Sequence, residues 1–300
     1  IPFSRSFSKY STFTNEELLT AAFASVVEKY NLKGKELGEV AAGAVMKKSA
    51  DWNLTRESAI GAGLSPKTPC YDVIRACGTG LEATLQVANK IALSQIDVGM
   101  AGGTDSNSDL PMVLSKNFSE RLIKMMKAKT MMEKMSSWSG VQLKDFKPQL
   151  PAVVEPRTNL SMGQHCELMA KEWKVTRQEQ DQLAYESHQK GAVAYKEGFY
   201  KDLVFPFSSL TQDENLRGDT TMEKMAKLKP AFDRSDKGTL TAANSTPLTD
   251  GASAVLLASE DYAKANNLPV LAYLTHVEVA AVDFVKGEGL LMAPTVAIAN

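Results

Sequence analysis

Two helices are predicted where apolar residues recur at helical spacing directly behind a capping box. Thr14 is followed three positions later by Glu17, and the helix that begins there is predicted to end near Gly34. Thr176 and Glu179 form the same pattern at the start of a long predicted helix. In a capping box each side chain accepts a hydrogen bond from the other residue's backbone, so local sequence alone defines both helix starts.

Short apolar runs alternate with a helical pattern in the first third of the chain. Buried strands are predicted at 40–45, 71–76 and 97–101. Between the second and third of these, apolar residues at helical spacing predict a helix over 81–92. The order of strand, helix and strand favours an α/β fold with a largely parallel sheet.

The second half of the chain predicts a polar loop and a hairpin. Residues 208–227 are polar and loop-like, and regular structure is predicted to resume at 238–244. Asp250-Gly251 is typical of a turn, and the apolar run 252–258 then predicts a strand. Two apolar runs around such a turn indicate a β-hairpin.

The overall composition is that of a globular protein and favours no particular partner. Hydrophobic residues make up 44% and charged residues 23%, and the net charge of −1 provides no overall attraction to nucleic acid. We find no apolar run long enough to span a bilayer and no secretory signal. Cys70, Cys77 and Cys166 lack the spacing of zinc or redox motifs, so we expect free thiols in a reducing compartment and no metal site.

One segment departs from this balance of charge. Residues 116–147 carry eight lysines and arginines against three acidic residues, a net charge of +5, with methionines and Trp138 interleaved. This pattern predicts an inserted, basic, amphipathic helical segment. Three interpretations remain open, which are a solvated surface helix, a helix that lies on a membrane surface, and a docking face for a partner subunit.

Cys77 is the candidate nucleophile because it lies between a predicted strand and a predicted helix. Free backbone N–H groups at the first turn of a helix carry partial positive charge, which favours a thiolate and can stabilise an oxyanion. Gly78, Thr79 and Gly80 keep the approach to the sulfur open. A cysteine in an α/β chain is by itself more often a packing residue than a nucleophile. The residues around Cys77 must therefore show which of the two it is.

A segment around Cys77 resembles the nucleophile motif of the thiolase family: Asp72-Val73-Ile74-Arg75-Ala76-Cys77-Gly78-Thr79-Gly80-Leu81-Glu82-Ala83. Further motifs similar to those of this family follow in order along most of the chain: Ala101-Gly102-Gly103-Thr104-Asp105-Ser106 as a Gly-Gly turn, Ser161-Met162-Gly163 with Glu167, the helix positions Arg177, Gln180, Asp181, Ser187 and His188, and the runs 228–232, 238–245 and 248–253. Within the family, the basic insert and the run 225–230 resemble most the thiolase (β) subunit of trifunctional fatty-acid oxidation complexes.

The resemblance implies a fold and its division into domains. The expected fold is the α/β thiolase fold, layered α-β-α-β-α around a mixed sheet. Residues 1–115 are expected to form the first part of the N-terminal thiolase domain, and residues 116–237 an inserted loop domain. Residues 238–266 are expected to return strands to the N-terminal domain, and residues 267–300 to begin the C-terminal thiolase domain.

The resemblance also implies a reaction and the residues that perform it. Cys77 would attack the ketone carbon of 3-ketoacyl-CoA and hold the shortened acyl chain as a thioester until a second coenzyme A removes it. Met162, Ala242 and Thr246 correspond to positions that line the substrate channel, and the last two lie near the pantetheine arm. Thr246 stands where many thiolases have serine. Coenzyme A is a substrate here, and no cofactor is expected.

The family's remaining acid–base residues are not found among the motifs of this chain. A thiolase needs a histidine that activates the nucleophile and a second cysteine, both in C-terminal motifs. His165, His188 and His276 do not stand in the expected Gly-His-Pro context, and helix geometry turns the adjacent His165 and Cys166 about 100° apart. We therefore expect a C-terminal portion to be absent and this chain alone to be inactive.

Two alternatives to β-oxidation stay open. A biosynthetic acetoacetyl-CoA thiolase, an acetyl-CoA C-acetyltransferase, would use the same cysteine for condensation, and a non-catalytic lipid-binding or scaffold module would use none. The expected partners are acyl-CoA and CoA, a second copy of the chain in a homo-oligomer, a hydratase/dehydrogenase α subunit, and a peripheral membrane contact through 116–147. The expected location is the bacterial cytoplasm or the mitochondrial matrix.

Overall fold

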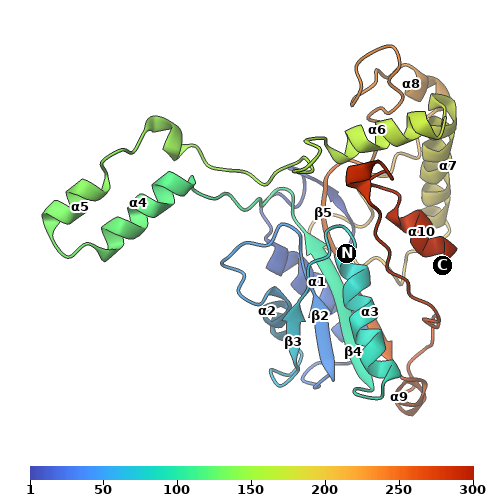
Figure 1. The fold of residues 1–300 in the computed structure, drawn as a ribbon. Coiled ribbons are helices and arrows are strands. Elements are labelled where there is room, and N and C mark those ends of the chain that lie inside the picture. Colours follow the sequence, from blue (N-terminus) through green and yellow to red (C-terminus); the bar gives the residue numbers. More distant parts are fainter. The chain divides into compact units, whose positions relative to one another are not determined.

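The computed structural model describes residues 1–300, which form two compact units, one of 1–109 with 153–300 and one of 110–152. The larger unit holds a five-stranded mixed sheet in the order β1-β5-β4-β2-β3 (Figure 1). Strand β2 pairs in parallel with β3 and β4, whereas β5 is antiparallel to β4 and β1. The strands are β1 (Ser4–Arg5), β2 (Glu39–Ala42), β3 (Cys70–Asp72), β4 (Val98–Asp105) and β5 (Thr249–Ala258).

Helices of the larger unit follow and connect these strands. They are α1 (Asn15–Lys29), α2 (Leu54–Gly61), α3 (Thr79–Ala92), α6 (Met162–Glu172), α7 (Arg177–Lys196), α8 (Met222–Ala226), α9 (Glu260–Ala265) and α10 (Ala293–Ala299), with a 3-10 turn at Phe284–Lys286. The capping boxes at Thr14 and Thr176 are confirmed as the starts of α1 and α7. Helix α1 ends before the predicted Gly34, because Asn31 adopts a left-handed φ of 53°. None of the helices combines the length and the apolar character needed to cross a membrane.

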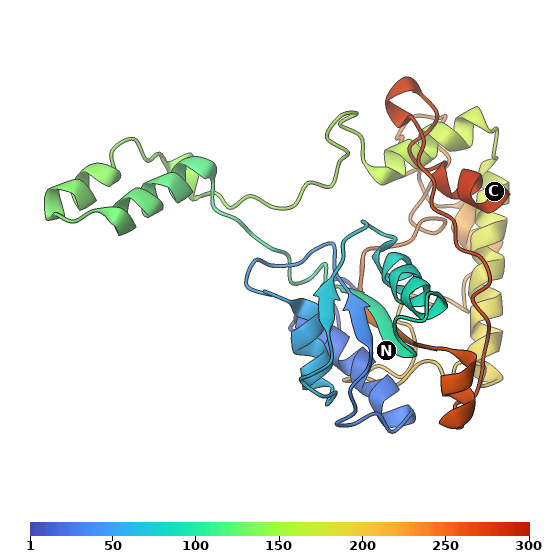
Figure 2. The same cartoon turned by 60° about the horizontal axis from the view of Figure 1, so that its bottom comes forward.

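Helices cover both faces of the sheet. Val40 and Ala42 of β2 belong to a core cluster with residues of α1 and α2, whereas Ala41 packs with Ala83 and Val87 of α3. Figure 2 shows α1 and α2 on one side of β2 and β4, and α3 on the other. Because successive side chains of a strand point to opposite faces, this arrangement explains why every residue of β2 is buried.

Helix α3 forms as predicted, but it buries a different face. The apolar spacing that predicted the helix includes Leu81, which is exposed. The residues of α3 that are buried against the sheet are Thr79, Ala83 and Val87. Small side chains at the contact let the helix approach the backbone of β4 closely, and the larger leucine is left outside.

The predicted hairpin and the predicted Gly-Gly turn are wrong. Strand β4 continues through Gly102 and Gly103 to Asp105, and Asp250 and Gly251 lie inside β5. The two strands pair with each other, with Gly103 opposite Ser253. A Cβ atom at Gly102 would lie 2.6 Å from the Ser253 carbonyl oxygen, so glycine is required here by the close approach of the partner strand.

Three shorter predictions need smaller corrections. Strand β2 ends at Ala42 and β3 at Asp72, earlier than predicted. The two backbones come very close directly after these ends, since a Cβ atom at Gly43 would lie 1.9 Å from the Val73 carbonyl oxygen. The predicted loop 208–227 contains the short helix α8. Residues 238–248 have no regular structure, contrary to the prediction for 238–244.

The smaller unit, 110–152, is helical as the basic segment predicts. It contains α4 (Lys116–Lys127), α5 (Met131–Ser137) and a 3-10 helix (Leu143–Phe146). Phe118 holds these elements together, with ring centroids 6.0 Å from Trp138 and 4.8 Å from Phe146. Many apolar side chains of this unit remain exposed, including Ile123, Met126, Met131, Met132, Met135 and Leu143. The domain boundaries at 115, 237 and 266 stay predictions.

Candidate active site

Cys77 lies in a tight turn between β3 and α3, which we call the elbow (residues 73–78). Helix α3 begins at Thr79, two residues earlier than predicted, with Gly78 as its N-cap, so Cys77 lies directly before the cap. The thiol is exposed, whereas the thiols of Cys70 and Cys166 are partly buried. Ala76, directly before Cys77, has a φ of +42°. Such a left-handed conformation is strained for a residue with a side chain and persists only where neighbouring contacts hold it.

Thr79 supplies the contacts that hold the elbow. Its Oγ1 donates a hydrogen bond to the Ala76 carbonyl oxygen at 2.7 Å and accepts one from the Arg75 backbone N–H at 2.9 Å. The Gly78 N–H donates to the Arg75 carbonyl oxygen at 2.9 Å. The buried Thr79 hydroxyl therefore bonds the backbone of Arg75 and of the strained Ala76. These bonds fix the orientation of the next residue, Cys77.

Three backbone donors close to the sulfur remain free. The N–H groups of Cys77, Gly80 and Leu81 have no acceptor within the protein. The first turn of α3 presents two of them, because the first N–H groups of a helix lack an intrahelical partner. Such donors carry partial positive charge and bind anions. These donors can therefore stabilise an oxyanion that forms next to the sulfur.

A cavity of about 630 Å³ opens at Cys77. Its walls come from the start of α3, from β4 and from β5, and small residues such as Gly80 and Gly103 leave the space open. A Cβ atom at Gly103 would lie 3.4 Å from the Gly80 Cα, so the helix start and the strand nearly touch behind the cavity. Gly80 and Gly103 are motif residues in the sequence, but the sequence does not show that they form one wall of the cavity at Cys77.

Asp105 is the one carboxylate at this cavity. Burial raises its pKa, and its two oxygens accept hydrogen bonds from the backbone N–H groups of Val45 and Met46 at 3.2 and 2.8 Å. These bonds give Asp105 a structural role at the end of β4. No histidine lines the cavity.

The other candidate residues lie elsewhere. Ala242 and Thr246 line a second cavity of about 490 Å³, together with His188 and Arg217. Met162 is half exposed at the first position of α6 and lines neither this cavity nor the one at Cys77. The structure thus brings Ala242 and Thr246 together but does not join them to Cys77 in one cavity.

Cys70, Cys166 and His165 pack within the protein, whereas His188 lies at the second cavity and His276 is exposed. Burial raises the pKa of Cys70 to about 11, and burial also raises the pKa of Cys166. His165 is buried with its Nε2 2.7 Å from the Thr158 hydroxyl, and His188 Nδ1 accepts from the Arg217 N–H at 3.2 Å. No three His, Cys, Asp or Glu side chains lie close enough together to hold a metal ion.

Comparison with known proteins identifies the family. The model of the thiolase N-terminal domain matches residues 1–261. The chain belongs to the thiolase family. Members of this family are acyltransferases. The thiolase fold expected from the motifs is therefore confirmed, and it places Cys77 in the domain that the family model describes.

Relatives of this thiolase chain span its whole length. A 3-ketoacyl-CoA thiolase of Yersinia enterocolitica is 38% identical over 302 residues, which cover 99% of this chain and 69% of the relative. A 3-ketoacyl-CoA thiolase of Vibrio cholerae is 39% identical over the same shares.

Solved thiolase structures share the fold. An acetyl-CoA acetyltransferase of Bacillus anthracis superposes with a TM-score of 0.77 at 27% identity, over 94% of this chain and 69% of that one. Human mitochondrial 3-ketoacyl-CoA thiolase in complex with CoA superposes with a TM-score of 0.72 at 26% identity, over 89% of this chain and 64% of that one.

Proposed function

We propose that this thiolase chain takes part in the cleavage of 3-ketoacyl-CoA to acetyl-CoA and an acyl-CoA shortened by two carbons, with Cys77 as the acyl carrier. The observation that carries the proposal is the exposed thiol in a strained elbow, beside three free backbone donors and an open cavity. The names of the relatives at 38–39% identity support the same reaction.

The proposed chemistry follows from this geometry. The Cys77 thiolate attacks the ketone carbon, and the carbonyl oxygen becomes an oxyanion that the free N–H groups can bind. When the oxyanion collapses, the bond to the acetyl unit breaks, and its electron pair leaves as the acetyl-CoA enolate, which takes up a proton. The acyl group stays on the sulfur as a thioester until the thiolate of a second CoA displaces it.

The biosynthetic direction is the second candidate, because the structure similar at a TM-score of 0.77 is an acetyl-CoA acetyltransferase. Condensation of two acetyl-CoA molecules would use the same acyl-cysteine. Initial rates of the native protein with acetyl-CoA alone, and with 3-ketoacyl-CoA of increasing chain length plus CoA, separate the two. Turnover of acetoacetyl-CoA only would favour the biosynthetic enzyme.

Mass spectrometry of the native protein tests the acyl carrier. After incubation with acetoacetyl-CoA we expect an acetyl adduct on the peptide that contains Cys77, and none in Cys77→Ala. Cys166→Ala is the matched control, because it removes a thiol outside the Cys77 cavity and should leave the adduct unchanged. An adduct on another residue in the unchanged protein would refute the assignment, and no adduct at all would favour the scaffold hypothesis.

We further propose that the basic unit 110–152 binds an anionic membrane surface. Exposed Ile123 and Met126 lie on α4 with the cations Lys124 and Lys127, which is the pattern of an interfacial helix. Each cation near an anionic surface contributes about 1 kcal/mol. Changing both lysines to glutamine is therefore expected to weaken co-sedimentation with phosphatidylserine vesicles roughly 10-fold or more.

Matched lysines on α7 provide the control for this experiment. Lys190 and Lys196 are exposed, and their change to glutamine should leave vesicle binding unaltered. Equal binding of both double variants would contradict the membrane proposal. If pull-down of a hydratase/dehydrogenase subunit is lost instead, this unit is a subunit-docking face.

Assembly and location complete the proposal. We propose a homo-oligomer in the bacterial cytoplasm or the mitochondrial matrix, since the relatives include bacterial thiolases and a human mitochondrial one. Light scattering of the native protein would show a mass above that of one chain.

A further inference from the structure

The loop 239–247 has a defined conformation without belonging to any helix or strand. Two carboxylates hold it from behind, Glu167 on α6 and Asp181 on α7. Both are almost completely buried, at 2% and 3% exposure. A buried carboxylate is unfavourable unless hydrogen bonds and an opposite charge compensate it. The hydrogen-bond partners of Glu167 and Asp181 therefore indicate the structural role of each carboxylate.

Glu167 binds the first residues of the loop. Its Oε1 accepts hydrogen bonds from the Thr239 N–H and the Thr239 hydroxyl, each at 2.8 Å, and its Oε2 accepts from the Leu240 N–H at 2.9 Å. The Lys171 ammonium, which pairs directly with Asp233, lies 3.9 Å from Oε1. The Glu167 carboxylate therefore accepts the backbone hydrogen bonds that the carbonyl groups of a neighbouring strand would accept in a sheet.

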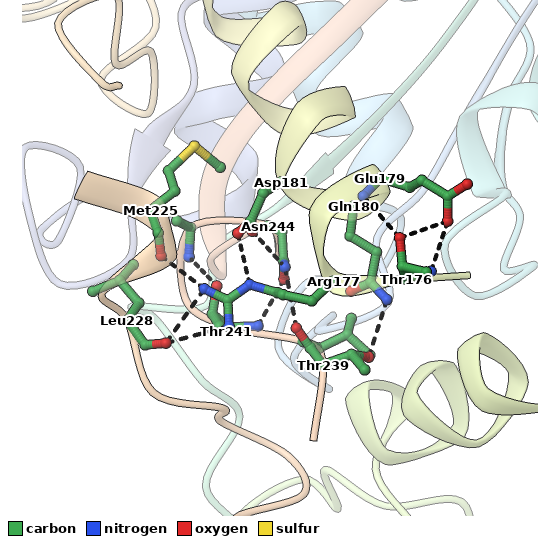
Figure 3. A network of polar contacts seen from close by, with 12 residues as sticks. Thr176, Arg177, Glu179, Gln180, Asp181, Met225, Leu228, Thr239, Thr241 and Asn244 are labelled. Carbon is green, nitrogen blue, oxygen red and sulfur yellow. Dashed lines mark hydrogen bonds and ion pairs between the residues drawn. The ribbon is translucent and has the colours of Figure 1, made fainter. Parts of the chain in front are cut away.

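Asp181 controls the next residues through Asn244 (Figure 3). Asp181 Oδ1 accepts from the Asn244 Nδ2 at 2.8 Å, and Asn244 Oδ1 accepts from the Thr241 N–H at 2.7 Å. The Asn244 side chain thus links the interior of the loop to α7. Since Thr241 is fully buried, its N–H would be left without a partner if this link were lost.

Arg177 orients Asp181. Its Nε donates to Asp181 Oδ2 at 2.7 Å, one turn along the same helix, and its Nη2 donates to the Met225 carbonyl oxygen at 2.7 Å. The guanidinium therefore also ties the C-terminal end of α8 to α7, as Figure 3 shows. Both oxygens of Asp181 are engaged by fixed donors, which leaves the carboxylate a single orientation.

The opposite side of the loop faces the second cavity. Ala242, Ser245 and Thr246 line it, and the Ser245 hydroxyl and the Asn215 amide oxygen are buried there without a hydrogen-bond partner. His188 and Arg217 bring cationic or polar groups to the same cavity. The polar network behind the loop therefore determines where these cavity-lining residues lie.

We propose that Asp181, acting through Asn244, is a positioning residue for the arm of coenzyme A: it fixes the loop that presents Ala242 and Thr246 to the ligand. This inference rests on the proposed function, which requires coenzyme A, and on the resemblance that places Ala242 and Thr246 near its pantetheine arm. Asp181 itself touches no substrate. It sets the shape of the binding surface before the ligand arrives, and preorganisation of this kind increases affinity.

The test is the affinity of the native protein for coenzyme A after Asp181→Asn. The amide group would place a donor against the Arg177 Nε or the Asn244 Nδ2, which breaks one of the two links. We expect the dissociation constant for CoA to rise about 10-fold, while iodoacetamide labels Cys77 at a rate within about twofold of the unchanged protein. Hydrogen exchange at the Thr241 amide should accelerate.

Two further variants keep the test decisive. Glu186→Gln removes a carboxylate that pairs with Lys190 at 3.2 Å on the exposed side of α7, and it should change nothing. Asn244→Ala leaves the Arg177–Asp181 pair intact. If Asp181→Asn does not fold, this variant replaces it in the measurement of CoA affinity. The double variant Asp181→Asn with Asn244→Asp restores donor against acceptor, so it should recover part of the lost affinity.

The outcomes separate the two proposals. Failure of the unchanged protein to bind CoA would overturn the proposed function and this inference with it. Normal CoA binding by both Asp181→Asn and Asn244→Ala would overturn the positioning role alone. Weakened binding by Glu186→Gln to the same extent would also overturn it, because the effect would then not depend on the loop.

Discussion

The elbow and the loop 239–247 are both irregular segments, but their backbone donors are used in opposite ways. In the elbow, Ala76 is strained and the Cys77 N–H stays free, as do the N–H groups of Gly80 and Leu81 in the adjoining first turn of α3. In the loop, Glu167 of α6 accepts from the N–H groups of Thr239 and Leu240, and Asn244 of the loop itself, bonded to Asp181 of α7, accepts from that of Thr241. Free donors suit a place where negative charge develops during a reaction, whereas satisfied donors suit a surface that must keep its shape.

The largest effect on stability is expected when the loop 239–247 loses the Glu167 carboxylate. Glu167→Ala leaves the buried N–H group of Leu240 and the partly buried N–H group of Thr239 without a partner, and a buried unpaired group costs about 1–3 kcal/mol. We expect the free energy of unfolding to fall by about 3 kcal/mol. Urea denaturation followed by circular dichroism measures this.

The elbow should not respond to that change. Labelling of Cys77 by iodoacetamide in folded Glu167→Ala is expected to stay within about twofold of the original rate, because the two segments share no hydrogen bond. A parallel loss of stability and of Cys77 reactivity would show that the elbow and the loop form one cooperative element and not two independent segments.

A smaller effect is expected from the hydroxyl that holds the elbow. Thr79→Val keeps the shape of the side chain but removes both hydrogen bonds to the strained backbone. We expect the labelling rate of Cys77 to drop about 10-fold, which corresponds to about 1.4 kcal/mol, as the thiol turns away from the free donors. Thr79→Ser, which keeps the hydroxyl, should restore most of the rate, and hydrogen exchange in the loop should be unchanged. If valine and serine behave alike, the hydroxyl does not position the elbow.

The last effect concerns pH and Cys70, the thiol outside the site. Burial raises the pKa of Cys70 to about 11, so below this pH its labelling rate should rise about 10-fold per pH unit with the thiolate fraction. The contribution of this thiol to stability is fully present below its ordinary pKa of 9.0 and is lost as the pH rises through 11. Peptide mapping after labelling at pH 8, 9 and 10 measures the rate. A rate that begins to level off near pH 9, the ordinary pKa of a thiol, would mean that Cys70 is not buried in solution.

Local sequence decided the features that depend on neighbouring residues. The capping boxes at Thr14 and Thr176 fixed the starts of α1 and α7, because donor and acceptor lie three residues apart. The helical character of 116–147 followed in the same way from its own apolar spacing. The motif around Cys77 pointed to the thiol, and its resemblance to a family gave it a role that spacing could not.

Tertiary structure alone decided the features that depend on distant partners. Gly102 and Gly251 resemble turn residues in the sequence but lie inside strands, because β4 and β5 pair across about 150 residues of chain. No local pattern shows which face of α3 meets the sheet, or that Asn244 reaches Asp181 from 63 positions away. A hydrogen bond between distant residues forms only once the sheet has brought α7 and the loop together, and this physical step is absent from the linear sequence.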